Sequence, residues 1–150
     1  MWCWSASRGL RALHGLKLSL VDKGTAVTID SSHKVVNGGR VESKGVDGRG
    51  IVITGSVTSG VTNKGTITLA TDADDKTVDG GNYGILLDTG ASMTGDILND
   101  TSGTITVAGV KSAGIVTRGT LTGNIKNDGK IAATGDGGLG MLLSGNITGI

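Results

Sequence analysis

Few residues in this sequence could carry out covalent or acid–base chemistry. Among its 150 residues the only histidines are His14 and His33, and the single cysteine is Cys3. A Ser or Cys nucleophile needs a base within hydrogen-bond reach, and neither histidine has a spacing that suggests such a partner. We therefore predict that the chain has no catalytic residues and is not an enzyme.

A cluster of acidic residues is the next candidate for a binding site. Four aspartates lie in one short stretch with the only tyrosine just after them: Asp72, Asp74, Asp75, Asp79 and Tyr83. Oxygen-rich loops can bind Ca²⁺, but this stretch lacks the spacing of an EF-hand loop with its final Glu. It also lacks the glycine-rich nonapeptide of Ca²⁺-binding β-rolls. We interpret it as a solvated loop that is the best candidate for a binding surface, and we predict no metal site.

A glycine-rich stretch at residues 135–140 matches the pattern GxGxxG. A dinucleotide site requires a helix directly after that pattern, because the helix N-terminus binds the pyrophosphate. Residues 141–145 indicate a short strand instead. We therefore predict that residues 135–140 form a corner, and we expect no cofactor.

Aliphatic residues recur at regular intervals over most of the chain. Spacings of 10, 10 and 6 residues separate Val41, Ile51, Val61 and Ile67, which gives a period of 26. The same spacings separate Ile105, Ile115, Ile125 and Ile131. The intervening unit, from Ile67 to Ile105, is longer by 8, 2 and 2 residues in its three connections. Constant elements joined by variable loops are typical of a repeat array.

The repeat predicts an all-β right-handed parallel β-helix, or solenoid. Each unit has three short aliphatic segments bounded by Gly or Asn, which indicates three short strands per coil of about 26 residues. The stretch between Ile67 and Ile85 would be one long inserted corner loop. The chain has 28 Gly, no Pro and 2% aromatic residues. That composition suits strands paired on both sides around a narrow aliphatic interior.

One Asn recurs at the same place in each unit and predicts a structural ladder. It follows an aliphatic strand residue by two positions and precedes a Gly, as Asn37, Asn63, Asn99 and Asn127. Asn tolerates the backbone conformations of a corner. Its amide both donates and accepts, so stacked Asn side chains can hydrogen-bond from coil to coil.

Asp88 and Arg118 are the one pair that keeps an enzymatic alternative open. Each follows the Ile of a Gly-Ile motif by three residues, so they would be neighbours on successive coils. β-Helix polysaccharide lyases and hydrolases use acids with Arg or Lys on one sheet face. We interpret this single pair as a surface ion pair, which contributes little to stability.

Two regions divide the chain. Residues 1–24 lack the repeat motifs, and we expect them to be disordered or to form a short helix; they contain no recognisable signal peptide. Residues 25–150 form the solenoid array, which we expect to be truncated at its C-terminus because no polar cap is visible. The net charge of +1 gives no argument for binding nucleic acid.

Three stretches resemble the passenger-domain repeats of bacterial autotransporters and related adhesins: residues 84–90, 121–131 and 144–149. The resemblance covers roughly residues 35–150. It implies a β-helix displayed at the cell surface, on the outer membrane or outside the cell, and a C-terminal translocating β-barrel in the full-length protein that this chain lacks.

The resemblance leads to an expected function. We expect a structural or adhesive passenger fragment with no chemistry of its own, whose partner is a ligand on a host surface or on a neighbouring cell. The alternative is a fragment of a β-helix carbohydrate-active enzyme, either a polysaccharide lyase or a hydrolase.

Overall fold

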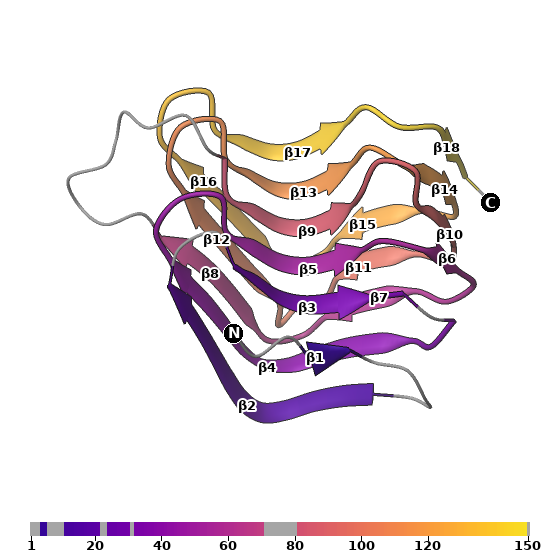
Figure 1. The fold of residues 1–150 in the computed structure, drawn as a ribbon, viewed down its shortest axis with the longest axis horizontal. Coiled ribbons are helices and arrows are strands. Elements are labelled where there is room, and N and C mark those ends of the chain that lie inside the picture. The colour runs from indigo at the N-terminus through magenta and orange to yellow at the C-terminus, as the bar shows by residue number, and fades with distance from the viewer. Residues whose placement is uncertain (1–3, 6–10, 22–23, 31, 71–80, 150) are drawn as a thin grey trace.

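The chain folds as a β-solenoid of about four turns with about 27 residues per turn. The computed structural model describes residues 4–5, 11–21, 24–30, 32–70 and 81–149. Within these ranges every regular element is a strand, and strands of successive coils pair in parallel, stacked one above the other (Figure 1). The predicted all-β parallel solenoid is therefore confirmed.

The strands form three sheets, and each coil from β5 onward contributes to the first and second of them. The first sheet consists of β1 (Trp4–Ser5), β3 (Thr25–Ile29), β5 (Arg49–Ile53), β9 (Tyr83–Leu87), β13 (Ala113–Thr117) and β17 (Leu139–Leu143). The second consists of β6 (Ser56–Val57), β10 (Ser92–Thr94), β14 (Thr120–Thr122) and β18 (Ile147–Thr148). The third consists of β2 (Arg11–Val21), β4 (Val35–Lys44), β7 (Val61–Asn63), β8 (Thr66–Ala70), β11 (Ile97–Asn99), β12 (Thr104–Ala108), β15 (Ile125–Asn127) and β16 (Lys130–Thr134).

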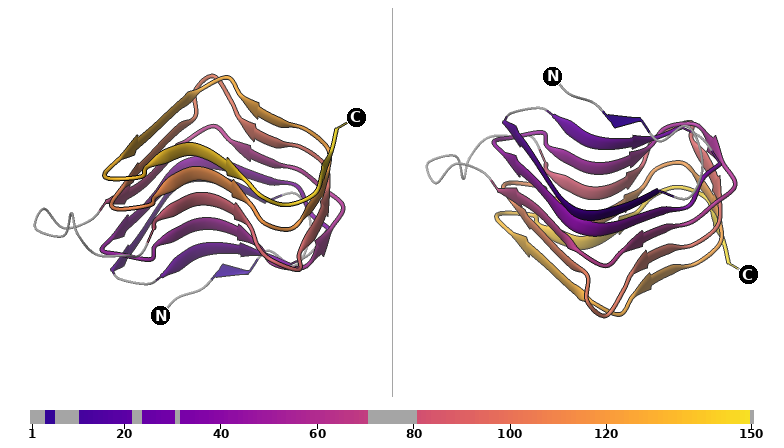
Figure 2. Two further views of the ribbon diagram at one scale, coloured as in Figure 1. Left: turned by 90° about the horizontal axis from the view of Figure 1, so that it is seen from above. Right: turned by 90° about the horizontal axis from the view of Figure 1, so that it is seen from below.

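The third sheet bends sharply in every coil, as the views from above and below show (Figure 2). β4 passes through the bend as one strand, whereas later coils are split there into β7 and β8, β11 and β12, or β15 and β16. Each complete coil thus has the three faces that were expected, but the third face consists of two short strands on either side of the bend.

The observed pairing matches the spacing of the aliphatic residues. Val41 pairs with Ile67, Ile67 with Ile105, and Ile105 with Ile131. The extra residues of the middle coil lie between β8 and β9, between β9 and β10, and between β11 and β12. Insertions therefore lengthen corners and leave the register of the strands unchanged.

Stacked aliphatic side chains fill the interior. In β8 and β12 buried residues alternate with half-buried ones, so one face of each strand points inward. In the first sheet the inward column includes Ile51, Ile85 and Ile115, all with 0% exposure. Thr117 takes the inward position that Leu87 has one coil earlier, and its buried hydroxyl has no hydrogen-bond partner among the described residues.

A column of Asn side chains occupies the bend of the third sheet. Asn37 donates from Nδ2 to Asn63 Oδ1 (2.8 Å), Asn63 donates to Asn99 (2.8 Å), and Asn99 donates to Asn127 (2.7 Å). The first three are fully buried, and the last is exposed. The four residues are paired in register through β4, β7, β11 and β15. The ladder expected from the spacing is present in these hydrogen bonds.

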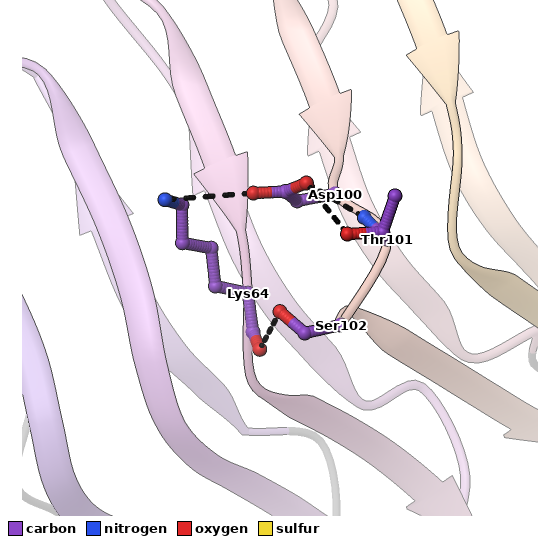
Figure 3. A network of polar contacts seen from close by, with 4 residues as sticks. All are labelled: Lys64, Asp100, Thr101 and Ser102. Atoms are coloured by element: carbon purple, nitrogen blue, oxygen red, sulfur yellow. Dashed lines mark hydrogen bonds and ion pairs between the residues drawn. The ribbon is translucent and has the colours of Figure 1, made fainter.

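The two-residue insertion after Asn99 is closed by its own polar groups (Figure 3). Asp100 Oδ1 accepts a hydrogen bond from the Thr101 backbone N–H at 2.7 Å, and this bond is the main reason that the pKa of Asp100 is lowered. Ser102 Oγ donates to the Lys64 carbonyl at 2.9 Å, and Lys64 Nζ lies 3.5 Å from Asp100 Oδ2. These contacts connect the insertion to the coil before it.

The expectation that residues 1–24 are disordered or helical is wrong for the part that the structure describes. β2 pairs in parallel with the whole of β4, and β1 pairs with β3. At register level Leu13 is opposite Asn37 and Leu18 is opposite Val41. Backbone pairing requires no Gly-Ile or Asn motif, because the N–H and C=O groups of β4 can form hydrogen bonds with any extended strand. Leu10, Leu13, Leu16 and Leu20 have the three- to four-residue spacing of a helix face, which is why a short helix was expected from the sequence.

The inserted loop expected between Ile67 and Ile85 falls on residues 71–80, which lie outside the described residues. Both flanking strands keep their places: β8 pairs with β4 and β12, and β9 pairs with β5 and β13. The solenoid is therefore continuous across the insertion. No helix in the described part of the chain is long and apolar enough to span a membrane.

Replacing Asn63 by Leu should destabilise the fold by about 1–3 kcal/mol, because the substitution leaves two buried amides without one partner each. Asn127→Leu is the matched control, since Asn127 is exposed and Asn99 Nδ2 also donates to the carbonyls of Gly103 and Lys130. Its cost should stay below about 0.5 kcal/mol. Urea unfolding measures both free energies, and equal losses would contradict a buried ladder.

Replacing Gly84 by Ala should also destabilise the fold, by about 1–3 kcal/mol, because there is no room for a methyl group. A Cβ there would lie 2.5 Å from the Gly114 carbonyl oxygen and 2.6 Å from Ile105 Cγ2. Gly140 begins the equivalent motif in the last coil and has no atom within 4 Å of such a Cβ. Gly140→Ala should therefore leave the melting temperature nearly unchanged; a comparable drop in both variants would argue against steric exclusion.

Candidate functional site

Three long side chains meet on the outer face of the first sheet. Arg49 and Tyr83 begin β5 and β9 and are opposite each other in register, and Arg118 directly follows β13. Val52, Leu86 and Val116 alternate with the inward Ile residues of these strands and so lie on the outer face. Tyr83 packs with them, and the guanidinium groups of both arginines lie beside its ring. We call these three residues the Arg–Tyr–Arg cluster.

The tyrosine ring lies close to both guanidinium groups. The guanidinium carbon of Arg49 is 4.2 Å from the ring centroid of Tyr83, and that of Arg118 is 4.9 Å from it. Arg118 Nη2 also donates to the Tyr83 hydroxyl at 2.7 Å. Arg49 Nη1 donates to the carbonyls of Gly48 (3.1 Å) and Gly81 (2.6 Å). Cation–π attraction and these hydrogen bonds hold the three side chains in one arrangement.

An apolar layer supports the cluster from below. Tyr83 packs with Val52, Leu86, Ala113 and Val116, which belong to three adjacent strands and are all buried. This apolar layer is separate from the main aliphatic core. Tyr83 itself is only 9% exposed. The ring is therefore anchored by packing, and the rotamer freedom that a surface tyrosine would have is lost.

Asn82, just before Tyr83, connects three successive coils beneath the cluster. Its Oδ1 accepts from the Gly48 N–H at 2.7 Å, and its Nδ2 donates to the carbonyls of Ala108 (2.8 Å) and Gly45 (3.1 Å). Gly45 and Gly48 lie between β4 and β5, and Ala108 ends β12. A fully buried amide with all these bonds holds the turn from which Tyr83 projects.

The cluster carries two positive charges without a direct counter-ion. In the described part of the chain no carboxylate oxygen lies within 4.0 Å of a guanidinium nitrogen of Arg49 or Arg118. The pKa of Arg49 is lowered chiefly because burial removes water from its charge. Tyr83, Asp47 and Asp88 act in the opposite direction, and the like charge of Arg118 adds to the lowering.

Asp88 and Arg118 lie on neighbouring coils, as their equal offsets predicted. The Arg118 backbone N–H donates to the Leu87 carbonyl at 2.8 Å, one residue before Asp88. The predicted ion pair between their side chains is absent, however. Asp88 Oδ1 instead accepts from the Thr89 N–H at 2.8 Å, and Arg118 extends to Tyr83. The turn after β9 holds the carboxylate, and the ring draws the guanidinium away from it.

The other residues selected from the sequence fall into two groups, those outside the described part of the chain and those at another corner of the solenoid. Asp72, Asp74, Asp75 and Asp79 lie outside the described residues, so Tyr83 is the one member of the candidate loop that the structure places. Residues 135–138 form the turn between β16 and β17, with positive φ at Gly135 and Gly137, as predicted for a corner, and residues 139–140 already belong to β17. Across the described ranges no three His, Cys, Asp or Glu side chains are grouped so that they could bind a metal ion.

Sequence reasoning missed Arg49 and Asn82. Arg49 precedes a Gly-Ile motif in the same way as Tyr83 does, and this shared offset was the available signal. The inserted residues separate the two positions by 34 residues and obscure the relation. Asn82 had no comparable signal, because its partners are backbone groups of turns.

A separate candidate is a hollow on the outer faces of β7, β11 and β15 in the third sheet. It has a volume of about 470 Å³, and Thr62, Leu98 and Lys126 are among the residues lining it. This volume is within the range of small-ligand sites. Two of its three charged groups are already engaged, since Asp96 Oδ1 accepts from the Asn124 N–H at 2.7 Å and Lys126 pairs with Asp128 at 2.8 Å, which leaves Lys34. The Arg–Tyr–Arg cluster is therefore the stronger candidate.

Comparison with known proteins identifies no relative. No family model matches the sequence, and no curated protein or solved structure is similar to it. The site must therefore be interpreted from its own geometry.

Tyr83→Phe and Tyr83→Ala should separate the hydrogen bond from the packing of the cluster. Loss of the hydroxyl in Tyr83→Phe removes the bond to Arg118 and should cost about 0.5–1.5 kcal/mol. Tyr83→Ala also uncovers the apolar layer and should cost about 3 kcal/mol or more. Urea unfolding measures both values. If Ala costs no more than Phe, the ring does not support this face of the sheet.

Proposed function

We propose that this chain is a structural and adhesive module, without chemistry of its own, from a surface-exposed protein of the autotransporter type. The observation that carries the proposal is that stacked side chains of successive coils fill the interior. The aliphatic columns and the Asn ladder fill it across the coils. Recognition is therefore left to the outer faces.

Repetition also makes the module suitable for display. Parallel strands of adjacent coils lie about 4.8 Å apart, so each coil adds a fixed length to the stack. Successive coils are paired through three sheets from β5 to β16, which resists bending in more than one direction. A stack of this kind can hold a binding surface at a defined distance from the point where the protein is attached.

The outer faces supply groups for contact with a partner. The Arg–Tyr–Arg cluster presents two cations on a rigid support, and the hollow of the third sheet presents polar side chains around Leu98. Among the described residues, neither site has the two facing carboxylates with which most glycosidases act. The proposed surface location rests on the resemblance of residues 84–90, 121–131 and 144–149 to passenger repeats.

Beads coated with the chain should adhere to epithelial cell layers or to one another, because many copies on one bead convert weak contacts into measurable avidity. Soluble chain in excess should displace the beads, and beads coated with an unrelated protein of similar size and charge should not bind. Adhesion is counted by microscopy. Absence of both bead–cell and bead–bead adhesion would contradict the proposal, and release of new sugar ends from polysaccharides would favour the carbohydrate-active alternative.

A further inference from the structure

We propose that the Arg–Tyr–Arg cluster binds the oxyanion of an acidic glycan, namely a carboxylate or sulfate group carried on a sugar chain. The inference gives the adhesive module a ligand class and in that respect rests on the proposed function. The binding site itself stands on the geometry of Arg49, Tyr83 and Arg118.

The charges of the cluster favour an anionic ligand. Both guanidinium groups lie within 5 Å of one ring centroid, at 4.2 and 4.9 Å, and neither has a carboxylate within 4.0 Å among the described residues. Like charges this close repel each other, and the repulsion is stronger where burial excludes water. An oxyanion bound beside them would offset this repulsion. Asp47 and Asp88 act on Arg49 only from a greater distance.

The two arginines have different roles in the proposed binding. Arg49 is half-buried, and its Nη1 is committed to the carbonyls of Gly48 and Gly81, so it supplies a charge in a fixed position. Arg118 is exposed, and within the described part of the chain its side chain makes only the bond from Nη2 to Tyr83. Its other N–H groups are therefore available as a fork, the geometry that matches carboxylate and sulfate oxygens.

The site also favours a glycan over an acidic peptide. An extended peptide usually binds a sheet by adding a strand to a free edge, where main-chain hydrogen bonds provide the affinity. β9 is paired with β5 on one side and with β13 on the other, so no edge is free beside the cluster. A glycan needs only side-chain partners. Asp88 provides one, because its Oδ1 is bonded to Thr89 while Oδ2 can accept from sugar hydroxyls.

Isothermal titration with short oligosaccharides tests the inference. The probes are a uronic-acid hexasaccharide, a sulfated hexasaccharide without uronate, a neutral carboxyl-reduced version of the first, and a glutamate hexapeptide. Wild-type chain should bind at least one acidic sugar and not the neutral one. Arg118→Ala should weaken binding about tenfold or more, and Arg118→Lys should restore only part of it, since the fork is lost.

Lys130→Ala is the matched control, because it removes one positive charge from an exposed position on β16. Its affinity should stay within about twofold of the wild type if the cluster, and not net charge, is responsible. The two acidic sugars distinguish a carboxylate source from a sulfate source. Far-UV circular dichroism of each variant verifies that it is folded.

Several results would overturn the inference: equal losses in Arg118→Ala and Lys130→Ala, no binding of either acidic sugar, or Arg118-dependent binding of the glutamate peptide that matches the sugars. These results are distinct from failure of the adhesive function. Beads that adhere without any effect of Arg118→Ala would overturn the glycan site alone. Sugar binding that depends on Arg118, together with beads that do not adhere, would overturn adhesion alone.

Discussion

The hydrogen-bonded column of Asn side chains at the bend of the third sheet is the constraint to which the rest of the coil conforms. Each amide donates to the one in the next coil at 2.7–2.8 Å, so consecutive Asn residues must stay in register. A shift of one residue would turn each side chain to the opposite face of its strand and leave buried amides unpaired. The neighbouring aliphatic column follows from the same register, because each Asn comes two residues after its aliphatic partner in one strand, as Asn63 after Val61 and Asn99 after Ile97. Polar and apolar stacking therefore require the same alignment.

This constraint explains where the chain tolerates change. Extra residues in the middle coil lie between the paired strands, and hydrogen bonds and an ion pair of Asp100, Thr101 and Ser102 connect one such insertion to the preceding coil. The N-terminal coil shows the opposite case. Leu13 is opposite Asn37 in register, so the ladder does not continue there although the backbone pairing does. Backbone hydrogen bonds alone extend the solenoid, whereas the side-chain columns determine its register.

The candidate site is a consequence of the same architecture. The residue before the glycine of a Gly-Ile motif lies on the outer face, where Val52, Leu86 and Val116 form an apolar layer. In two successive coils that residue has a long side chain: the charged Arg49 in one and the aromatic Tyr83 in the next. The third member, Arg118, comes from the end of the next strand and reaches back to the ring. A repeat that is regular inside thus brings three unrelated outward residues together.

The repeat length, the inward positions and the Asn ladder could be predicted from the residues alone, because each depends on local spacing that stacking preserves from coil to coil. The strand at residues 11–21 could not, since its pairing to β4 uses backbone groups that leave no pattern in the sequence. Asp88 and Arg118 illustrate the limit most clearly. Their equal offsets correctly predicted that they are neighbours, yet the partner of Arg118 is Tyr83. Outward side chains have several rotamers and potential partners on three coils, so only the packed tertiary structure decides which contacts form.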